Sequence, residues 1–216
     1  EDRKASPELR AKLEVLARSD PSPGVRLYVA SAAQRLGLEE RAPILEALMG
    51  HAEDAADQNL PFMAWYALAP IVSADLKAGA SWIAKTRIPK VREYVARRVA
   101  QGGDAEIASL VATLDGDGAE DVLQGLRESL KGRRRVAMPE GWAAIKARLP
   151  GNELVRHISV TFGDPEALAA LRAALADAKA GESDRENALA ALLAAGDPDL
   201  PAVLLALLDG RAIRRP

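Results

Sequence analysis

Hydrophobic positions recur at helical spacing along nearly the whole chain. Leu9, Leu13 and Leu16 form one apolar stripe, and Val91 and Val95 begin another further along. Spacings of three and four residues place such side chains on one face of an α-helix. This pattern indicates about thirteen helices of roughly ten to fourteen residues, joined by short turns, and no convincing strand. The sequence therefore predicts an all-α protein.

Helix start signals stand between the apolar stripes. A capping side chain precedes a first-turn proline at Ser6-Pro7, Ser22-Pro23 and Asp164-Pro165. Such a side chain accepts a hydrogen bond from an amide of the first turn that has no partner within the helix. Ser183 and Glu186 fit a capping box, in which each side chain bonds the other residue's amide. We expect a helix to begin at each of these four places.

One helix start recurs three times in the first half of the chain. The segments "PGVRLYVASA", "PFMAWYALAP" and "PKVREYVARR" begin 38 and 28 residues apart and align without gaps on their prolines. Each has a tyrosine five residues after its proline, namely Tyr28, Tyr66 and Tyr94. Arg26 and Arg92 occupy equivalent positions in the first and third segments. Equivalent positions in a repeat are expected to play equivalent parts.

A helix start repeated at this interval is typical of an α-solenoid, in which each helix pair buries its apolar face against its neighbours. We expect a single array of about six HEAT-like antiparallel helix pairs across residues 1–216. The repeats are best defined over 7–101 and more divergent over 102–216. The charged start "EDRKASPELR", directly before a capped helix, indicates a piece of a longer multidomain protein.

The composition of the chain excludes several kinds of site and partner. The chain has no cysteine, which excludes disulfides, thiolate catalysis, Cys-ligated zinc and covalent haem attachment within it. The formal net charge is −2 with both signs interspersed, which does not favour nucleic acid as a partner. No apolar run approaches the length of about 18 residues that a membrane span needs.

The stretch "DQNLPFMAWYAL" (57–68) concentrates aromatic side chains in a chain that has few. Polar residues His51, Glu53, Asp54, Asp57 and Asn59 come just before or at its start. One interpretation is a recognition site for a partner, or a divalent cation bound by these polar groups beside Trp65. The other is a loop between repeat helices, in which Asp57 or Asn59 caps the next helix and the aromatics Phe62, Trp65 and Tyr66 pack between repeats or line the inner surface. The unfixed ligand spacing makes a metal site the weakest of these interpretations.

Arg26 and Arg92 allow two interpretations as well. An arginine at a repeated position usually forms a salt bridge or a capping contact between adjacent repeats. An arginine that faces the inner surface of the array could instead contact a partner. Both possibilities stay open from the sequence.

Three further motifs are weaker. Asp115 and Asp117 resemble the start of a calcium loop, but Leu126 stands where an EF-hand needs glutamate. The basic run "KGRRR" (131–135) suits either a phosphate contact or a solvated loop after a helix end. His157 and Ser159 are two residues apart and so lie on different helix faces, which argues against nucleophilic catalysis.

Three segments carry a resemblance to a known family: "SDPSPGVRLYVASAAQRL" (19–36), "APILEALMGHAEDAADQNLPFMAWYALAPIV" (42–72) and "TRIPKVREYVARR" (86–98). With them, residues 6–100 resemble the HEAT-like segment of the membrane-bound-dehydrogenase-like proteins of the Pirellula/Verrucomicrobium haem-binding type. Gln58 and Ala69 depart from the family pattern, which has histidine and glutamate there. The resemblance implies a segment between a β-propeller dehydrogenase-like domain and a cytochrome-c-like domain. It also implies a periplasmic or extracellular location, and it transfers no catalytic residue.

These observations predict a non-catalytic helical-repeat scaffold or protein–protein interaction module without cofactor or metal. Its partner would be a neighbouring domain of the parent chain or another subunit. The alternative is a HEAT-like nucleic-acid-binding protein or DNA glycosylase that uses a basic concave groove. The candidate partner-binding residues are Asp57, Asn59, Phe62, Trp65, Tyr66, Arg26 and Arg92.

Overall fold

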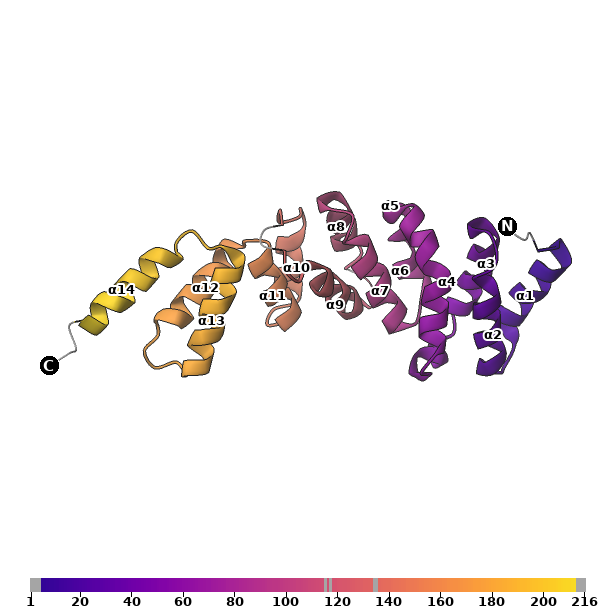
Figure 1. Cartoon of the computed structure of the whole chain (residues 1–216), viewed down its shortest axis with the longest axis horizontal. Helices are drawn as coiled ribbons and strands as arrows, with labels where there is room; N and C mark the ends of the chain where they lie inside the picture. Colours follow the sequence, from indigo (N-terminus) through magenta and orange to yellow (C-terminus); the bar gives the residue numbers. More distant parts are fainter. Residues whose placement is uncertain (1–4, 115, 117, 134–135, 213–216) are drawn as a thin grey trace. The chain divides into compact units, whose positions relative to one another are not determined.

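The computed structural model describes residues 5–114, 116, 118–133 and 136–212. Within these residues it contains fourteen α-helices, one short 3₁₀ helix (η1) and no strand (Figure 1). The prediction of an all-α protein is therefore confirmed. The chain divides into two compact units, Glu1–Ser129 (unit 1) and Leu130–Pro216 (unit 2). The finer prediction, one array of about six HEAT-like helix pairs across 1–216, stays a prediction.

Unit 1 contains two sets of helices that pack against each other. Helix α1 packs beside α3, while α2, α4 and α7 pack side by side in a row; α1 also contacts α2, and α3 contacts α4 (Figure 1). The helices are α1 (Pro7–Ser19), α2 (Pro23–Ala33), α3 (Leu38–Met49), η1 (Ala52–Ala56), α4 (Leu60–Ala74), α5 (Leu76–Gly79), α6 (Trp82–Lys85), α7 (Pro89–Val99), α8 (Asp104–Val111) and α9 (Ala119–Leu130). The three segments that share the repeated start are thus α2, α4 and α7.

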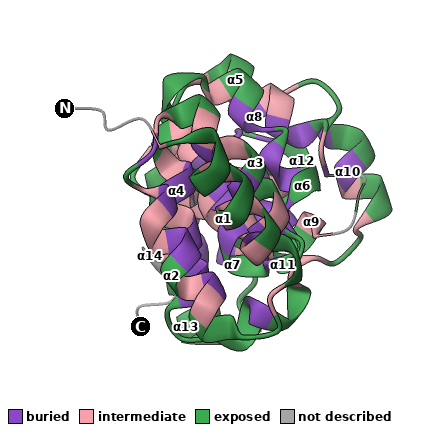
Figure 2. Ribbon diagram, turned by 90° about the vertical axis from the view of Figure 1, so that its right-hand side faces the viewer, coloured by how far each residue is buried: buried purple, intermediate pink, exposed green. Residues whose placement is uncertain are grey.

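The core of unit 1 is made of aliphatic and small side chains. Helix α4 lies at its centre, between α2 and α7, with Leu60, Ala64, Leu68 and Val72 fully buried. Figure 2 shows α4 largely buried or half-buried, in contrast to the exposed outer side of α1. Burial of this aliphatic surface holds α2, α4 and α7 together, because removing apolar surface from water stabilises the folded chain.

Helix α9 approaches α7 closely at Gly125. A Cβ atom added to Gly125 would overlap the carbonyl oxygen of Glu93 and lie 2.9 Å from the Cβ of Ala96. No larger residue fits at that point without a shift of one backbone against the other. Glycine in mid-helix therefore permits this packing, at the expense of helix propensity.

Helix starts follow the predicted caps at three of the four places. Ser6 Oγ accepts from Leu9 N at 3.3 Å, and Ser22 Oγ accepts from Val25 N at 3.4 Å. Asp164 does the same at the start of α12, where its Oδ1 lies 3.0 Å from Ala167 N. The fourth prediction is wrong. Helix α13 begins at Glu182, directly after Gly181, so that Ser183 lies inside the first turn and does not cap it.

Between α4 and α7 the helices are shorter than the pattern predicted. Residues 75–86 contain two helices of four residues each, α5 and α6. The side chain of Asp75 accepts from Ala78 N at 2.9 Å and starts α5. The chain turns after Gly79, whose backbone packs against Val72 without room for a side chain. The side chain of Trp82, on α6, is then buried.

Unit 2 contains α10 (Trp142–Arg148), α11 (Glu153–Thr161), α12 (Pro165–Ala176), α13 (Glu182–Ala195) and α14 (Leu200–Ala212). Helices α12 and α13 pack against each other around Leu168, Leu175 and Leu192. Trp142 is fully buried and meets the ring of Phe162 edge-on at 5.0 Å. None of the described helices is both long enough and apolar enough to span a membrane.

Candidate functional site

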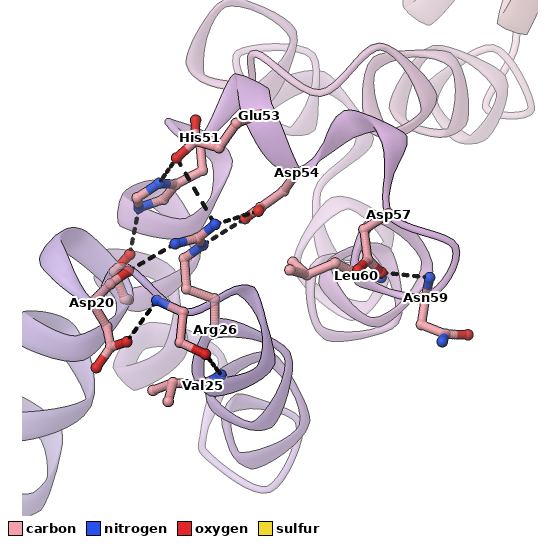
Figure 3. Close-up of polar contacts among 11 residues, drawn as sticks. Asp20, Val25, Arg26, His51, Glu53, Asp54, Asp57, Asn59 and Leu60 are labelled. Atoms are coloured by element: carbon pink, nitrogen blue, oxygen red, sulfur yellow. Dashed lines mark hydrogen bonds and ion pairs between the residues drawn. The ribbon is translucent and has the colours of Figure 1, made fainter.

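Arg26 is held inside unit 1 by a carboxylate and a backbone carbonyl. Its Nε donates to Asp54 Oδ2 at 2.7 Å, its Nη2 donates to Asp54 Oδ1, and its Nη1 donates to the carbonyl of Asp20 at 2.7 Å (Figure 3). Only 3% of Arg26 and 2% of Asp54 is exposed. The hydrogen bonds with Asp54 raise the pKa of Arg26 above its ordinary value, against the opposing effect of burial. The pair joins α2 to η1.

His51 and Glu53 extend this network. His51 Nδ1 lies 2.7 Å from Glu53 Oε1, and its Nε2 lies 2.9 Å from the carbonyl oxygen of Ala17 (Figure 3). A carbonyl can only accept, so Nε2 carries a hydrogen. The hydrogen bond from His51 lowers the pKa of Glu53. In the described part of the chain, no group of three or more His, Cys, Asp or Glu residues could hold a metal ion.

Arg92 repeats the arrangement of Arg26 on α7. Its Nε donates to the carbonyl of Thr86 at 3.0 Å, as Arg26 donates to a carbonyl six residues earlier. Its Nη1 lies 3.0 Å from a carboxylate oxygen of Asp121, which comes from α9. Burial raises the pKa of Asp121, and the positive charge of Arg92 opposes that rise. Both repeat-equivalent arginines therefore make ion pairs inside unit 1, so that their guanidinium groups are bound to carboxylates of the chain itself.

Asp57 starts helix α4. Its Oδ1 accepts from the amides of Asn59 and Leu60, both at 2.8 Å, and these hydrogen bonds lower its pKa (Figure 3). Of the two residues that the sequence offered as caps for α4, Asp57 is thus the one that binds the amides. The side chain of Asn59 makes no capping hydrogen bond and is exposed.

Large aromatic side chains of α2 and α4 are exposed. Tyr28 is 78% exposed, Tyr66 is 56% exposed and Phe62 is 39% exposed. Trp65 is half-buried, and its ring lies 5.6 Å from that of Tyr94 on α7. Phe62 contacts the same tyrosine at 6.1 Å between ring centroids. The aromatic residues predicted as a site therefore lie together, and they continue onto both neighbouring helices.

Two grooves run beside these residues. The first groove, about 540 Å³, lies between α2 and α4, and the second, about 350 Å³, lies between α4 and α7. Phe62 and Tyr66 line both, so the grooves adjoin each other. The first is also lined by Leu27, Tyr28, Ser31 and Asn59, and the second by Trp65, Tyr94, Arg97 and Arg98. We call these two grooves with their aromatic residues the aromatic surface.

The sequence located only the middle of this surface. Asn59, Phe62, Trp65 and Tyr66 were candidates, and all four line a groove. Tyr28 and Tyr94, which the sequence identifies only as members of the repeat, line the same grooves. Arg97 and Arg98 were missed, because nothing in "VREYVARR" distinguishes a groove-lining arginine from a solvated one.

The weaker motifs fall elsewhere. Asp115 and Asp117 of the suggested calcium loop, and Arg134 and Arg135 of the basic run, lie outside the described residues. His157 is exposed, whereas Ser159 is buried. The hydroxyl of Ser159 accepts from Trp142 Nε1 at 2.9 Å and donates to the carbonyl of Val155 at 2.8 Å. Ser159 is thus engaged on both sides in structural hydrogen bonds.

Comparisons of the chain with protein-family models, with curated proteins and with solved structures found no match. The resemblance to the dehydrogenase-like family accordingly rests on residues 19–36, 42–72 and 86–98 alone.

Proposed function

We propose that the chain is a non-catalytic helical-repeat module, an α-solenoid of HEAT-like pairs, that binds a protein partner through the aromatic surface. One observation carries this proposal. Tyr28, Tyr66 and Tyr94 occupy the same position in three repeated helices and line two adjoining grooves. A repeated residue on a repeated helix generates a row of similar contacts, which suits an extended partner.

Exposed aromatic side chains on rigid helices favour binding. Tyrosine and tryptophan supply a large contact area at low cost in conformational entropy, and they are enriched at the centres of protein interfaces. Tyr28 and Tyr66 are each more than half exposed, although both belong to helices whose other faces are buried. A partner that covers them would remove apolar area from water and supply the free energy of association.

The polar groups of the loop before α4, and Arg26 that binds it, favour a scaffold over an enzyme. Arg26, Asp54, His51 and Glu53 bond one another or backbone carbonyls. Asp57 bonds the first amides of α4. Groups with these partners hold loops in place, whereas acid–base catalysis needs a group free to exchange a proton with a substrate.

The resemblance suggests where such a module would work. In the dehydrogenase-like family it would lie between a β-propeller domain and a cytochrome-c-like domain. The aromatic surface would then hold one of these domains, or another subunit, at a set distance and orientation.

The proposal is tested by selecting binders for the full chain from a random displayed-peptide library and measuring the affinities of the selected peptides. Replacing Tyr28 and Tyr66 with alanine should weaken binding by about tenfold or more, as expected for aromatic residues at an interface centre. Leu9→Ala and Val15→Ala provide matched controls, because these α1 side chains are also more than half exposed but line neither groove. Selected peptides that bind the tyrosine variants as well as the unchanged chain would contradict the proposal.

A further inference from the structure

We infer that the second groove receives an acidic segment of the protein partner, with carboxylates of that segment bound by Arg97 and Arg98. The inference rests on the proposed function in taking the partner to be a protein, and it adds the chemistry of the segment. It follows from the charges that line the groove, the aromatic residues beneath them and the uncharged groove next to it.

Arg97 and Arg98 lack a carboxylate partner. Across the residues that the structure describes, the side chain of Arg97 makes no hydrogen bond or ion pair, and Arg97 is exposed. Arg98 bonds only neutral groups, with its Nε 2.9 Å from Ser73 Oγ and its Nη1 2.8 Å from Gln101 Oε1. On the same helix, by contrast, Lys90 is paired with Glu93 at 2.7 Å. Two positive charges on the groove therefore remain without an anion.

The aromatic wall of the second groove should strengthen the binding of a carboxylate by the two arginines. Phe62 and Trp65 lie against Tyr94, so aromatic rings form the wall beside the two arginines. A ligand that covers this wall excludes water, and charge pairs are stronger where the local dielectric is lower. The planar guanidinium group binds a carboxylate through two parallel hydrogen bonds and can stack on an aromatic ring. Among the described residues that line the second groove there is no aspartate or glutamate to compete for the guanidinium groups.

The first groove adds an apolar anchor. Its described lining carries no charged side chain, and Leu27, Met63 and Tyr28 give it a largely apolar surface. Packed helices lie about 8–10 Å apart, so the centres of the two grooves should be separated by a similar distance. An extended chain advances about 3.3 Å per residue. The segment would therefore place an apolar residue and an acidic residue about three positions apart.

An acidic protein segment fits better than nucleic acid. Affinity for nucleic acid depends on many phosphate contacts, with a basic stripe along the path of the backbone. Here two arginines lie at one end of the aromatic surface, and the described lining of the first groove has no cation. The whole chain has a net charge of −2. A single short acidic stretch beside an apolar residue matches this distribution.

The inference is tested by fluorescence anisotropy with the full chain and three labelled decapeptides. Each contains a leucine, followed three positions later by Glu-Glu, Gln-Gln or Lys-Lys. We expect the Glu-Glu peptide to bind at least about fivefold more tightly than the Gln-Gln peptide at low salt, with the difference shrinking as salt is added. Arg97→Glu should weaken binding of the Glu-Glu peptide by about tenfold and strengthen binding of the Lys-Lys peptide. Arg87→Glu is the matched control, because Arg87 is an exposed arginine that lines neither groove, and it should change affinity less than about twofold.

The possible outcomes separate this inference from the proposed function. If the three peptides bind equally well and their binding still depends on Tyr66, the inference of an acidic segment is overturned. The proposal that the aromatic surface binds protein then remains. Library-selected peptides that bind through Tyr28 and Tyr66 but are unaffected by Arg97→Glu and Arg98→Glu would do the same. A 20-nucleotide oligothymidine that binds more tightly than the Glu-Glu peptide would overturn it in favour of nucleic acid. Failure of every peptide, selected or designed, would contradict the proposed function itself.

Discussion

Arg26 and Asp54 form a two-pronged ion pair in which both side chains are almost completely buried. Removing two charges from water is costly, and their attraction offsets this only when the remaining hydrogen-bonding groups also find partners. The carbonyl of Asp20 provides one such partner for Arg26. Arg26 thereby connects α2 both to the end of α1, where Asp20 lies, and to η1 in the loop before α4 (Figure 3).

Breaking this pair from one side should destabilise unit 1 strongly. Asp54→Ala leaves a buried guanidinium without its carboxylate, and we expect a loss of about 3–5 kcal/mol in the free energy of unfolding. Urea denaturation followed by circular dichroism measures the loss, and hydrogen exchange of α2 and α4 amides locates it. Glu53→Ala, at the exposed neighbouring carboxylate, should change stability far less. Equal effects of the two substitutions would contradict the structural role of Asp54.

A double variant tests whether the loss of stability comes from the unpaired charge or from the loss of the ion pair itself. Replacing both charges, as Arg26→Met with Asp54→Leu, removes the unpaired charge as well as the ion pair. Such replacements are often neutral when the volume is kept, so the double variant should be more stable than Asp54→Ala alone. A double variant that is less stable than the single one would mean that the backbone carbonyl contact of Arg26 matters more than its ion pair.

Gly125 offers a test of the contact between α7 and α9. Alanine is the better helix former, so Gly125→Ala would stabilise an isolated helix by about 1 kcal/mol. In the folded chain its Cβ would overlap Glu93, and we expect a net loss of about 1–3 kcal/mol instead. Gly24→Ala is the control, since a Cβ there would meet only Ser22 Oγ, at 3.5 Å. In thermal denaturation, the midpoint temperature of Gly125→Ala should therefore fall, while that of Gly24→Ala should rise or stay unchanged.

Capping motifs in the sequence predicted three of four helix starts correctly, whereas contacts between distant segments were not predictable. Ser6, Ser22 and Asp164 cap because a proline directly follows each and sets the first turn. Ser183 has no such proline, and the helix begins earlier at Glu182, where acidic residues suit the positive end of the helix. A local motif therefore predicts a start reliably only when the neighbouring residues exclude an earlier one.

The candidate site shows the same limit. Repetition of Val-Arg-x-Tyr predicted that Arg26 and Arg92 play equivalent parts, but their carboxylate partners come from later segments that no local pattern identifies. The row of tyrosines could have been found, because their spacing from each proline was visible. The two arginines of the second groove could not, since their lack of an acidic partner depends on the packing of α7 beside α4.

The start of α4 should depend on pH through Asp57. Its hydrogen bonds from two amides lower the folded-state pKa below the ordinary value of about 3.9. The stabilisation is therefore fully present above the unfolded-state pKa and is lost as the pH falls through the folded-state pKa. Asp57→Ala should cost about 1 kcal/mol at pH 7 and become indistinguishable from the unchanged chain at low pH. Urea denaturation across this range checks it, and a gap that persists below both pKa values would contradict it.

Ser159 tests the packing of unit 2. Ser159→Ala removes the acceptor of the Trp142 indole N–H, which is then left buried without a partner. We expect a loss of about 1–3 kcal/mol in the stability of unit 2. His157→Ala, which removes an exposed side chain from the same helix, should have little effect and serves as the control. Hydrogen exchange of α10 and α11 amides reports the difference directly.

Whether the aromatic surface is where a protein partner binds is tested most directly by mapping a bound peptide on the full chain with NMR. A library-selected peptide is added to isotopically labelled protein, and amide shifts are followed residue by residue. We expect the largest changes on α2, α4 and α7, around Tyr28, Tyr66 and Tyr94, with saturation at the measured affinity. Saturable changes confined to α1 and α3, or to unit 2, would contradict the assignment of binding to the aromatic surface.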